Sequence, residues 1–276
     1  MRLGDIEIVR ELRKTGFQHV LFDFDGTISL LREGWQGVMQ SMMAEMICGD
    51  ETLTDRVNKR IMDFINKTTG YQTIIQMDGV IDLIREFNNI PEEEILDAQA
   101  YRKIYNDALM LPVNVRLDKL SKGEVTQEKM CVKGARDFVE GLATKGASLY
   151  IFSGTNEEDV RNEAELLGFA DRFKHIWGAL RTIEEYSKEK ILKELIEEHG
   201  LEGPEILIVG DGPVEIQLAR QYACKSVGVA SNEAKGGLDV VKRDRLWDAG
   251  ADIIVPDFKC ADELVNYLFE GPPTSE

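Results

Sequence analysis

The sequence predicts an α/β protein in which a helical region is inserted into a doubly wound parallel sheet. Two observations support this class. Short apolar runs, which suit buried parallel strands, alternate with helical patterns in the second half of the chain. About 120 residues of mostly helical pattern separate the first run from the second, too many for one crossover. With 276 residues, the chain can bury an α/β core and a smaller second unit.

Five apolar runs predict the strands of the sheet. They are HVLFDF (19–24), SLYIFS (148–153), EILIVGD (205–211), KSVGVA (225–230) and ADIIVPD (251–257). The N-terminal segment MRLGDIEIVRELRKTG is charged throughout and predicts an amphipathic helix rather than a signal peptide. The strand at 19–24 is therefore expected to be the first of the sheet.

The helices between the later strands have recognisable ends. Asn156 can cap the helix that follows it, and Gly168 can end it. Ser187 and Gly200 suit the same two roles for the next helix. Pro213 suits the first turn of a third helix. This alternation predicts a Rossmann-like core.

The interval after the first strand predicts a helical insertion domain. Its expected helices are 32–47, 51–69, 71–89, 91–110 and a shorter one near 113–121. Pro91 and the three glutamates after it suit the N-terminus of the fourth helix. Met39, Met42, Met43 and Met46 recur at helical spacing and predict packing. We expect residues 30–131 to form this domain, 1–29 and 132–270 to form the core, and 271–276 to be a disordered tail.

Composition narrows the class of partner. The net charge of −17 argues against a nucleic-acid backbone or an anionic membrane surface. No apolar run approaches the roughly 20 residues that cross a bilayer. The four cysteines form no CxxC pair, which is typical of reduced thiols, and the three histidines lie near no serine or cysteine motif. We therefore expect a cytoplasmic protein without histidine-driven catalysis.

Two aspartates at the end of the first strand raise a chemical question. Residues i and i+2 of a strand face the same way, about 6.5–7 Å apart, so Asp23 and Asp25 can share one site. Two such carboxylates repel each other unless a cation or a proton relieves them. Asp211 also ends an apolar strand and is followed by a glycine, so adjacent strands could bring it close to Asp23. An all-oxygen set of this kind suits Mg²⁺.

Two further motifs suit a phosphate group. Ser153 stands at a strand end, and the amides of Gly154 and Thr155 lead into a helix N-terminus, which favours an anion. Lys188 starts another helix and offers a point charge, with Lys190 as the rival for that role.

The order DFDGT, Ser-Gly-Thr, lysine and GDG resembles the haloacid dehalogenase-like hydrolase superfamily, most of whose members are phosphatases. The position of the insertion is similar to that of subfamily I, whose members carry an α-helical cap. The resemblance implies that Asp23 is the nucleophile and that Asp25 is the general acid and base. It implies that Asp23, the main-chain carbonyl of Asp25 and Asp211 hold Mg²⁺. Ser153 and Lys188 would hold the transferring group.

Some positions depart from the family pattern or stay open. In the last motif, the family usually has a second aspartate four residues after the first, which is Asp211 here. This chain has Glu215 at that position. Glu215 could reach the metal through a water or hold Lys188. In the cap, Arg32, Trp35, Tyr71 and Gln72 are candidate substrate contacts. A tryptophan in an apolar helical stripe is also typical of a core residue.

The predicted function is a Mg²⁺-dependent phosphatase acting on a small phosphorylated metabolite, such as a sugar phosphate, through an aspartyl phosphate. A phosphomutase of the β-phosphoglucomutase type would use the same aspartates. A phospho-acceptor signalling module is the alternative from another class, but a cap of roughly 100 residues is more than such a switch needs.

Overall fold

The computed structural model describes residues 2–12, 17–179 and 186–272. Within them, one eight-stranded sheet has the order β1-β2-β8-β7-β6-β3-β4-β5. The run from β8 to β5 is parallel, and β1 and β2 are antiparallel additions beside β8. The strands are β1 (Arg2–Leu3), β2 (Ile6–Ile8), β3 (His19–Phe22), β4 (Ser148–Asn156), β5 (His175–Ala179), β6 (Ile206–Gly210), β7 (Lys225–Val229) and β8 (Ile253–Val255).

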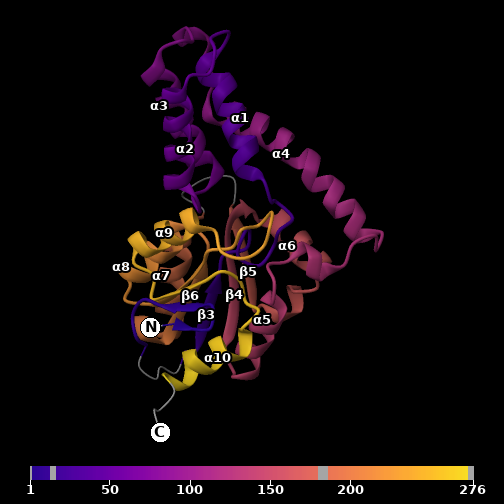
Figure 1. Ribbon diagram of the computed structural model, residues 1–276, viewed down its shortest axis with the longest axis vertical. Helices are drawn as coiled ribbons and strands as arrows, with labels where there is room; N and C mark the ends of the chain where they lie inside the picture. The colour runs from indigo at the N-terminus through magenta and orange to yellow at the C-terminus, as the bar shows by residue number, and fades with distance from the viewer. Residues whose placement is uncertain (1, 13–16, 180–185, 273–276) are drawn as a thin grey trace.

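The central strand β3 is buried on both faces because its side chains alternate between two layers of helices. Val20 and Phe22 face one layer and Leu21 faces the other. The first layer is α5 (Ala135–Thr144), α6 (Glu157–Leu166) and α10 (Ala261–Glu270); the second is α7 (Lys188–His199), α8 (Pro213–Gln221) and α9 (Val240–Ala249) (Figure 1). The predicted doubly wound α/β class is confirmed.

The five predicted strands are all present, with small shifts at their ends. The prediction of an N-terminal amphipathic helix is wrong. Ile6 and Ile8 are buried and Glu7 between them is not. This two-residue period is typical of a strand, and the segment forms β2, which pairs with β8. Residues 1 and 13–16 of that predicted helix lie outside the described residues. The edge strand β5 was not predicted, because it is short and partly exposed.

The predicted helix ends in the core are confirmed by their hydrogen bonds. The Asn156 side chain accepts from the Glu158 amide at 3.0 Å, and Ser187 Oγ accepts from the Lys190 amide at 3.0 Å. Gly168 and Gly200, which follow these helices, both have positive φ, a conformation that glycine adopts without strain.

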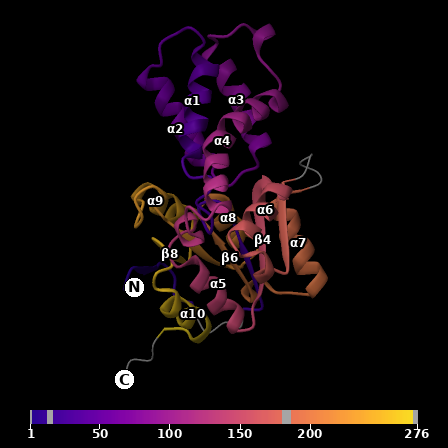
Figure 2. The same ribbon diagram turned by 90° about the vertical axis from the view of Figure 1, so that its right-hand side faces the viewer.

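The inserted region is a four-helix unit above the carboxyl edge of the sheet (Figures 1 and 2). Its helices are α1 (Trp35–Cys48), α2 (Asp55–Thr68), α3 (Thr73–Phe87) and α4 (Ala98–Ser121). They bury an apolar cluster of their own, separate from the clusters on the sheet. Met39, Met42 and Met43 lie inside it and Met46 packs against it, as predicted.

The last helix of this unit departs from prediction in two ways. Residues Glu92–Glu94 form only a 3₁₀ turn, and α4 begins later because the Asp97 side chain accepts from the Ala100 amide at 2.8 Å. The helix then continues through Pro112, so no separate helix exists near 113–121. Buried side chains on both sides of the proline hold it in one piece, among them Leu109 and Val113.

The two chain crossings between core and insertion run side by side. The Leu30 amide donates to the Met130 carbonyl at 2.8 Å, and the Val132 amide donates to the Ile28 carbonyl at 2.9 Å. We propose residues 30–131 as the cap domain, 1–29 and 132–270 as the core, on the basis of this double crossing. Of the predicted tail, 273–276 lie outside the described residues. No helix in the described part of the chain is long and apolar enough to cross a membrane.

Candidate active site

The predicted acidic residues meet at the carboxyl ends of adjacent strands. Asp23 follows β3, Asp211 follows β6, and both side chains are buried. Gly26 has a φ of 75°, and a Cβ there would overlap Asp211 Oδ2. A glycine at this turn therefore lets the two strand ends approach each other.

One buried lysine joins the end of β3 to the first turn of α8. Lys188 Nζ donates to Asp23 Oδ1 at 2.6 Å and also contacts Glu215 Oε1. All three side chains are at most 8% exposed. Lys190 is exposed on the same helix, so it is Lys188 that the structure brings to Asp23. We call Lys188, Asp23 and Glu215 the Lys188 cluster.

Glu215 fits this cluster through its longer side chain. Glycines lie beside this side chain. A Cβ added at Gly70 would lie only 2.8 Å from Glu215 Oε1, and a Cβ added at Gly212 would lie only 2.7 Å from Glu215 Oε2. The buried Oε2 has no hydrogen-bond partner among the described residues. Glu215 therefore holds Lys188, one of its two expected roles.

A second buried lysine, which was not predicted, contacts Asp211. Lys242 Nζ donates to Asp211 Oδ2 and to Glu233 Oε1, both at 2.8 Å. The Lys242 side chain is 4% exposed. We call Lys242, Asp211 and Glu233 the Lys242 cluster. Lys242 follows no recognisable motif, so its role could not be read from spacing.

The carboxylates repel one another in spite of these lysines. Burial raises the pKa of Asp23 well above its usual range, and the charges of Glu215 and Asp211 raise it further, while Lys188 acts in the opposite direction. A further cation beside Asp23, the nucleophile that the resemblance implies, would act in the same direction as Lys188 and lower this pKa.

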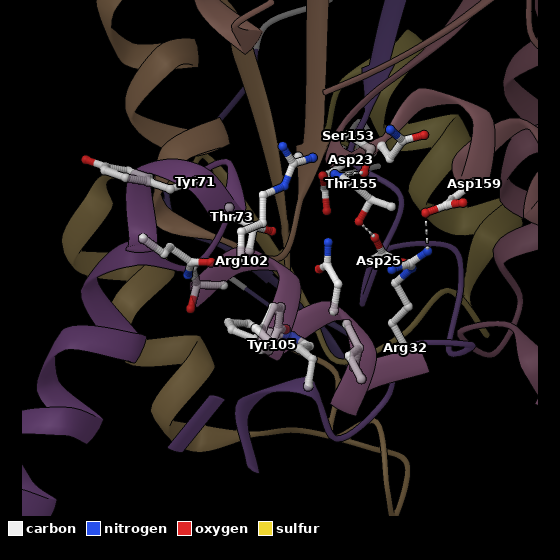
Figure 3. A pocket seen from close by; sticks show the side chains of 18 of the residues that line it. Asp23, Asp25, Arg32, Tyr71, Thr73, Arg102, Tyr105, Ser153, Thr155 and Asp159 are labelled. Carbon is white, nitrogen blue, oxygen red and sulfur yellow. Dashed lines mark hydrogen bonds and ion pairs between the residues drawn. The ribbon is translucent and has the colours of Figure 1, made fainter. Parts of the chain in front are cut away.

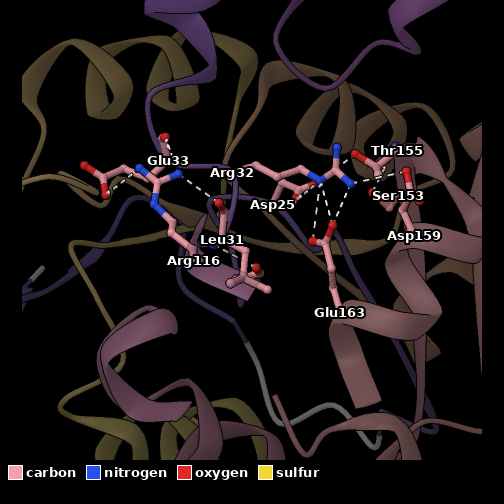
Figure 4. Close-up of polar contacts among 10 residues, drawn as sticks. Asp25, Leu31, Arg32, Glu33, Arg116, Ser153, Thr155, Asp159 and Glu163 are labelled. Carbon is pink, nitrogen blue, oxygen red and sulfur yellow. Dashed lines mark hydrogen bonds and ion pairs between the residues drawn. The ribbon is translucent and has the colours of Figure 1, made fainter. Parts of the chain in front are cut away.

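Asp25 is held from the strand that carries Ser153. Thr155 Oγ1 donates to Asp25 Oδ2 at 2.7 Å, and Arg32 Nε lies 3.8 Å from Asp25 Oδ1 (Figure 4). Burial raises the pKa of Asp25, and Arg32 and Thr155 offset only part of that rise. A carboxyl group with a raised pKa can carry a proton to a leaving group.

Arg32, an expected substrate contact, is engaged by the core. Its Nη2 lies 2.6 Å from Glu163 Oε1 and 3.4 Å from Asp159 Oδ2, both on α6 (Figure 4). Burial raises the pKa of Glu163 to about 7, although the guanidinium acts in the opposite direction. Arg32 therefore anchors the first crossing beside Asp25, and its guanidinium is already paired.

A cavity of about 140 Å³ lies between cap and core (Figure 3). The core side includes Asp23, Asp25, Ser153, Gly154 and Asp211. A Cβ at Gly154 would lie 3.1 Å from the Tyr71 carbonyl, so the loop between α2 and α3 sits directly over this strand end.

The cap side of the cavity includes some predicted residues and some that were missed. Trp35 lines it and also packs against the cap core, and Tyr71 lines it as well. Gln72 does not line it, because its amide donates to the Tyr186 carbonyl at 2.7 Å. Arg102 and Asn106, one turn apart on α4, line it without having been predicted. In the sequence, only one feature could have pointed to Arg102 and Asn106: they are polar residues next to the apolar stripe of a helix.

The residues present suit a Mg²⁺ ion. No cluster of three or more His, Cys, Asp or Glu side chains in the described residues forms a complete metal site. Mg²⁺ commonly takes one or two protein carboxylates and completes its shell with carbonyl and water oxygens. Asp23 and Asp211 supply two, and the repulsion that raises the pKa of Asp23 is what a divalent cation would relieve.

Comparison with known proteins agrees with the fold. A family model described as haloacid dehalogenase-like hydrolase matches residues 20–229. Among solved structures, a predicted phosphatase from Clostridium acetobutylicum is 18% identical, with a TM-score of 0.59, covering 92% of this chain and 99% of that one.

Two further solved structures are similar. A predicted phosphoglycolate phosphatase from Haemophilus somnus is 17% identical, with a TM-score of 0.59 and coverages of 91% and 97%. A β-phosphoglucomutase from Clostridium difficile is 14% identical, with a TM-score of 0.58 and coverages of 91% and 97%. At these identities the likeness concerns the fold. A comparison with curated protein sequences found no match.

Proposed function

The chain belongs to the haloacid dehalogenase-like hydrolase family, and from this premise we propose that it is a Mg²⁺-dependent phosphatase of small phosphorylated metabolites. The observation that carries the proposal is the placement of Asp23 in the cavity, with Lys188 on one of its oxygens and Asp25 close by. The substrate would be a phosphate monoester such as a sugar phosphate, and the protein would act in the cytoplasm.

In the first step, a carboxylate oxygen of Asp23 attacks the phosphorus. A P–O bond forms to Asp23 as the P–O bond to the substrate alcohol breaks, and Asp25 gives its proton to the leaving oxygen. Thr155 donates to Asp25 Oδ2 and Arg32 lies 3.8 Å from Oδ1, so the carboxyl group is held in a fixed orientation for this transfer. The raised pKa of Asp25 favours the protonated form that this step requires.

In the second step, water attacks the phosphorus of the aspartyl phosphate. Asp25, now a carboxylate, takes a proton from that water, and the bond between phosphorus and Asp23 breaks to release inorganic phosphate. Asp25 is again protonated and Asp23 is again a carboxylate, so the cycle closes without another reactant.

Charge is the main obstacle to this chemistry, because a carboxylate must approach a phosphate anion. We propose that Lys188, Ser153 and the Gly154 amide hold the phosphoryl oxygens. Mg²⁺, held by Asp23, Asp211 and the main-chain carbonyl of Asp25, would supply the further positive charge that phosphoryl transfer needs. The limited volume of the cavity, about 140 Å³ between cap and core, supports a small substrate.

The test is phosphate release from p-nitrophenyl phosphate with Mg²⁺. We expect turnover that stops with EDTA and that falls by at least about 10⁴-fold in Asp23→Asn. Equal rates for the wild type and Asp23→Asn would refute the proposal. Formation of an isomerised sugar phosphate without free phosphate would identify a mutase, and a long-lived aspartyl phosphate without turnover would identify a signalling module.

A further inference from the structure

Arg102 is a cation in the cavity that has no partner among residues 2–12, 17–179 and 186–272. It is half-buried on α4 and lines the cavity, and its guanidinium extends toward Asp23 and Ser153 (Figure 3). No hydrogen bond or ion pair joins it to any other described residue. Three other arginines at the junction of cap and core are engaged by the protein: Arg32, which also lines the cavity, by Glu163, Arg116 by the Leu31 carbonyl, and Arg245 by Asn66.

The surroundings of the Arg102 guanidinium allow it to bind a ligand. Water can solvate the exposed part of a half-buried arginine, and an anion that enters the cavity can replace that water. Carboxylates line the core side of this cavity at Asp23, Asp25 and Asp211, yet none lies within ion-pair distance of Arg102. The side chain is therefore available to an anion that enters from outside.

That anion need not be the transferring phosphoryl group. Lys188 contacts Asp23 from the core, and Ser153 and Gly154 line the core side of the same cavity. Arg102 comes from the opposite wall, on the same helical face as Asn106, where the leaving-group part of a substrate would lie. A guanidinium binds a carboxylate or a phosphate through two parallel hydrogen bonds, which fixes its orientation.

We propose that Arg102 is a specificity residue that binds a second oxyanion, a carboxylate or a second phosphate, on the leaving-group part of the substrate. The substrates are then small phosphate monoesters with two anionic ends. This inference rests on the proposed phosphatase function and narrows its substrate class.

The test compares two substrates that differ in one group. 3-Phosphoglycerate carries a carboxylate where glycerol 3-phosphate carries a hydroxymethyl group. We expect the wild type to favour 3-phosphoglycerate by about 10- to 100-fold in kcat/KM, the range for a charged hydrogen bond. The readout is this ratio rather than either rate. Arg102→Gln should bring the ratio close to one, mainly through KM, and Arg102→Lys should retain part of it.

The adjacent Lys103 provides the matched control. It is exposed on the same helix and pairs with Asp107 at 2.5 Å, so Lys103→Gln should keep the wild-type ratio. Fructose 1,6-bisphosphate against fructose 6-phosphate forms the second arm. A preference that depends on Arg102 only in this arm would identify the oxyanion as a phosphate.

Failure of this inference is distinguishable from failure of the phosphatase proposal. Suppose that the wild type hydrolyses p-nitrophenyl phosphate. A wild-type kcat/KM ratio near one for both substrate pairs, or an equal loss of kcat/KM for both substrates of a pair in Arg102→Gln, would then overturn the role of Arg102. With no turnover of any ester, calorimetry on Asp23→Asn decides the subsite alone. The role of Arg102 is supported if Asp23→Asn binds 3-phosphoglycerate more tightly than glycerol 3-phosphate, or the bisphosphate more tightly than fructose 6-phosphate, and if Asp23→Asn/Arg102→Gln loses this difference. Equal binding of all four ligands by both variants refutes it.

Discussion

The Lys188 and Lys242 clusters have the same composition but different positions in the site. In each, a buried ammonium joins one strand-end aspartate to one glutamate. Lys188 holds Asp23, the proposed nucleophile, whereas Lys242 holds Asp211 by the oxygen beside Gly26. The other oxygen of Asp211 is then the one available to the Mg²⁺ ion that we propose. Similar ion pairs can therefore serve different purposes: Lys188 can act on the reacting group, and Lys242 can only orient a ligand.

Among the substitutions that test this comparison, Lys188→Met should have the largest effect, because it should lower both kcat and the stability of the fold. The transferring phosphoryl group would lose a charged donor, so kcat should fall by about 10²–10³-fold. Two buried carboxylates would lose their partner, which should lower the free energy of unfolding by about 3–5 kcal/mol. Steady-state kinetics and urea denaturation measure the two effects. Lys190→Met, on the exposed side of the same helix, should change neither, and a Lys188→Met enzyme with normal kcat would contradict the assignment.

Lys242→Met tests the other cluster. Without Mg²⁺, the unpaired Asp211 and Glu233 should again lower the free energy of unfolding by about 3–5 kcal/mol. Bound Mg²⁺ would replace part of the missing positive charge, so it should raise Tm more in this variant than in the wild type. At saturating Mg²⁺ the loss of kcat should be smaller than for Lys188→Met. A loss of the same size would show that the two lysines are equivalent.

Glu163 extends the comparison to Arg32, a third buried cation. The pKa of Glu163 is about 7 in the folded chain against its ordinary value of 4.5, so the folded state binds the proton more tightly than the unfolded state does. The resulting stabilisation is complete below about pH 4.5 and is lost as pH rises through 7. Relative to Glu163→Gln, the wild type should therefore lose about 1–3 kcal/mol across this window. Denaturation at several pH values measures it, and parallel curves for the two proteins would contradict it.

Glu215→Asp should have the smallest effect and would restore the usual residue of the family. The shorter side chain would leave a gap among Gly70, Gly210 and Gly212 and would pull away from Lys188. We expect a loss of about 1 kcal/mol in stability and about 10-fold in kcat. Asp262→Glu, on α10 far from the cavity, is the control for adding or removing a methylene. An unchanged or faster enzyme would show that Lys188 does not need the longer glutamate.

Much of the core could be predicted because the relevant signals are local. Apolar runs marked five of the strands, and Asn156, Ser187, Gly168 and Gly200 marked helix ends through contacts within a few residues. The short strand β2 was mistaken for part of a helix because its partner, β8, lies about 245 residues away in the chain. The continuation of α4 through Pro112 was missed for a similar reason, since packing in the cap outweighs the proline's local preference.

The fold class and the order of the site motifs can be read from the amino-acid sequence, because strand ends, caps and turns depend on residues that are close along the chain. Three contacts of the site follow only from the three-dimensional fold: Lys188 rather than Lys190 reaches Asp23, Arg32 is engaged by α6, and Lys242 holds Asp211. Within the part of the chain that the structure describes, Arg102 lines the cavity and has no partner. Which buried charges neutralise each other depends on distances of a few ångströms between distant segments, and folding alone sets those distances.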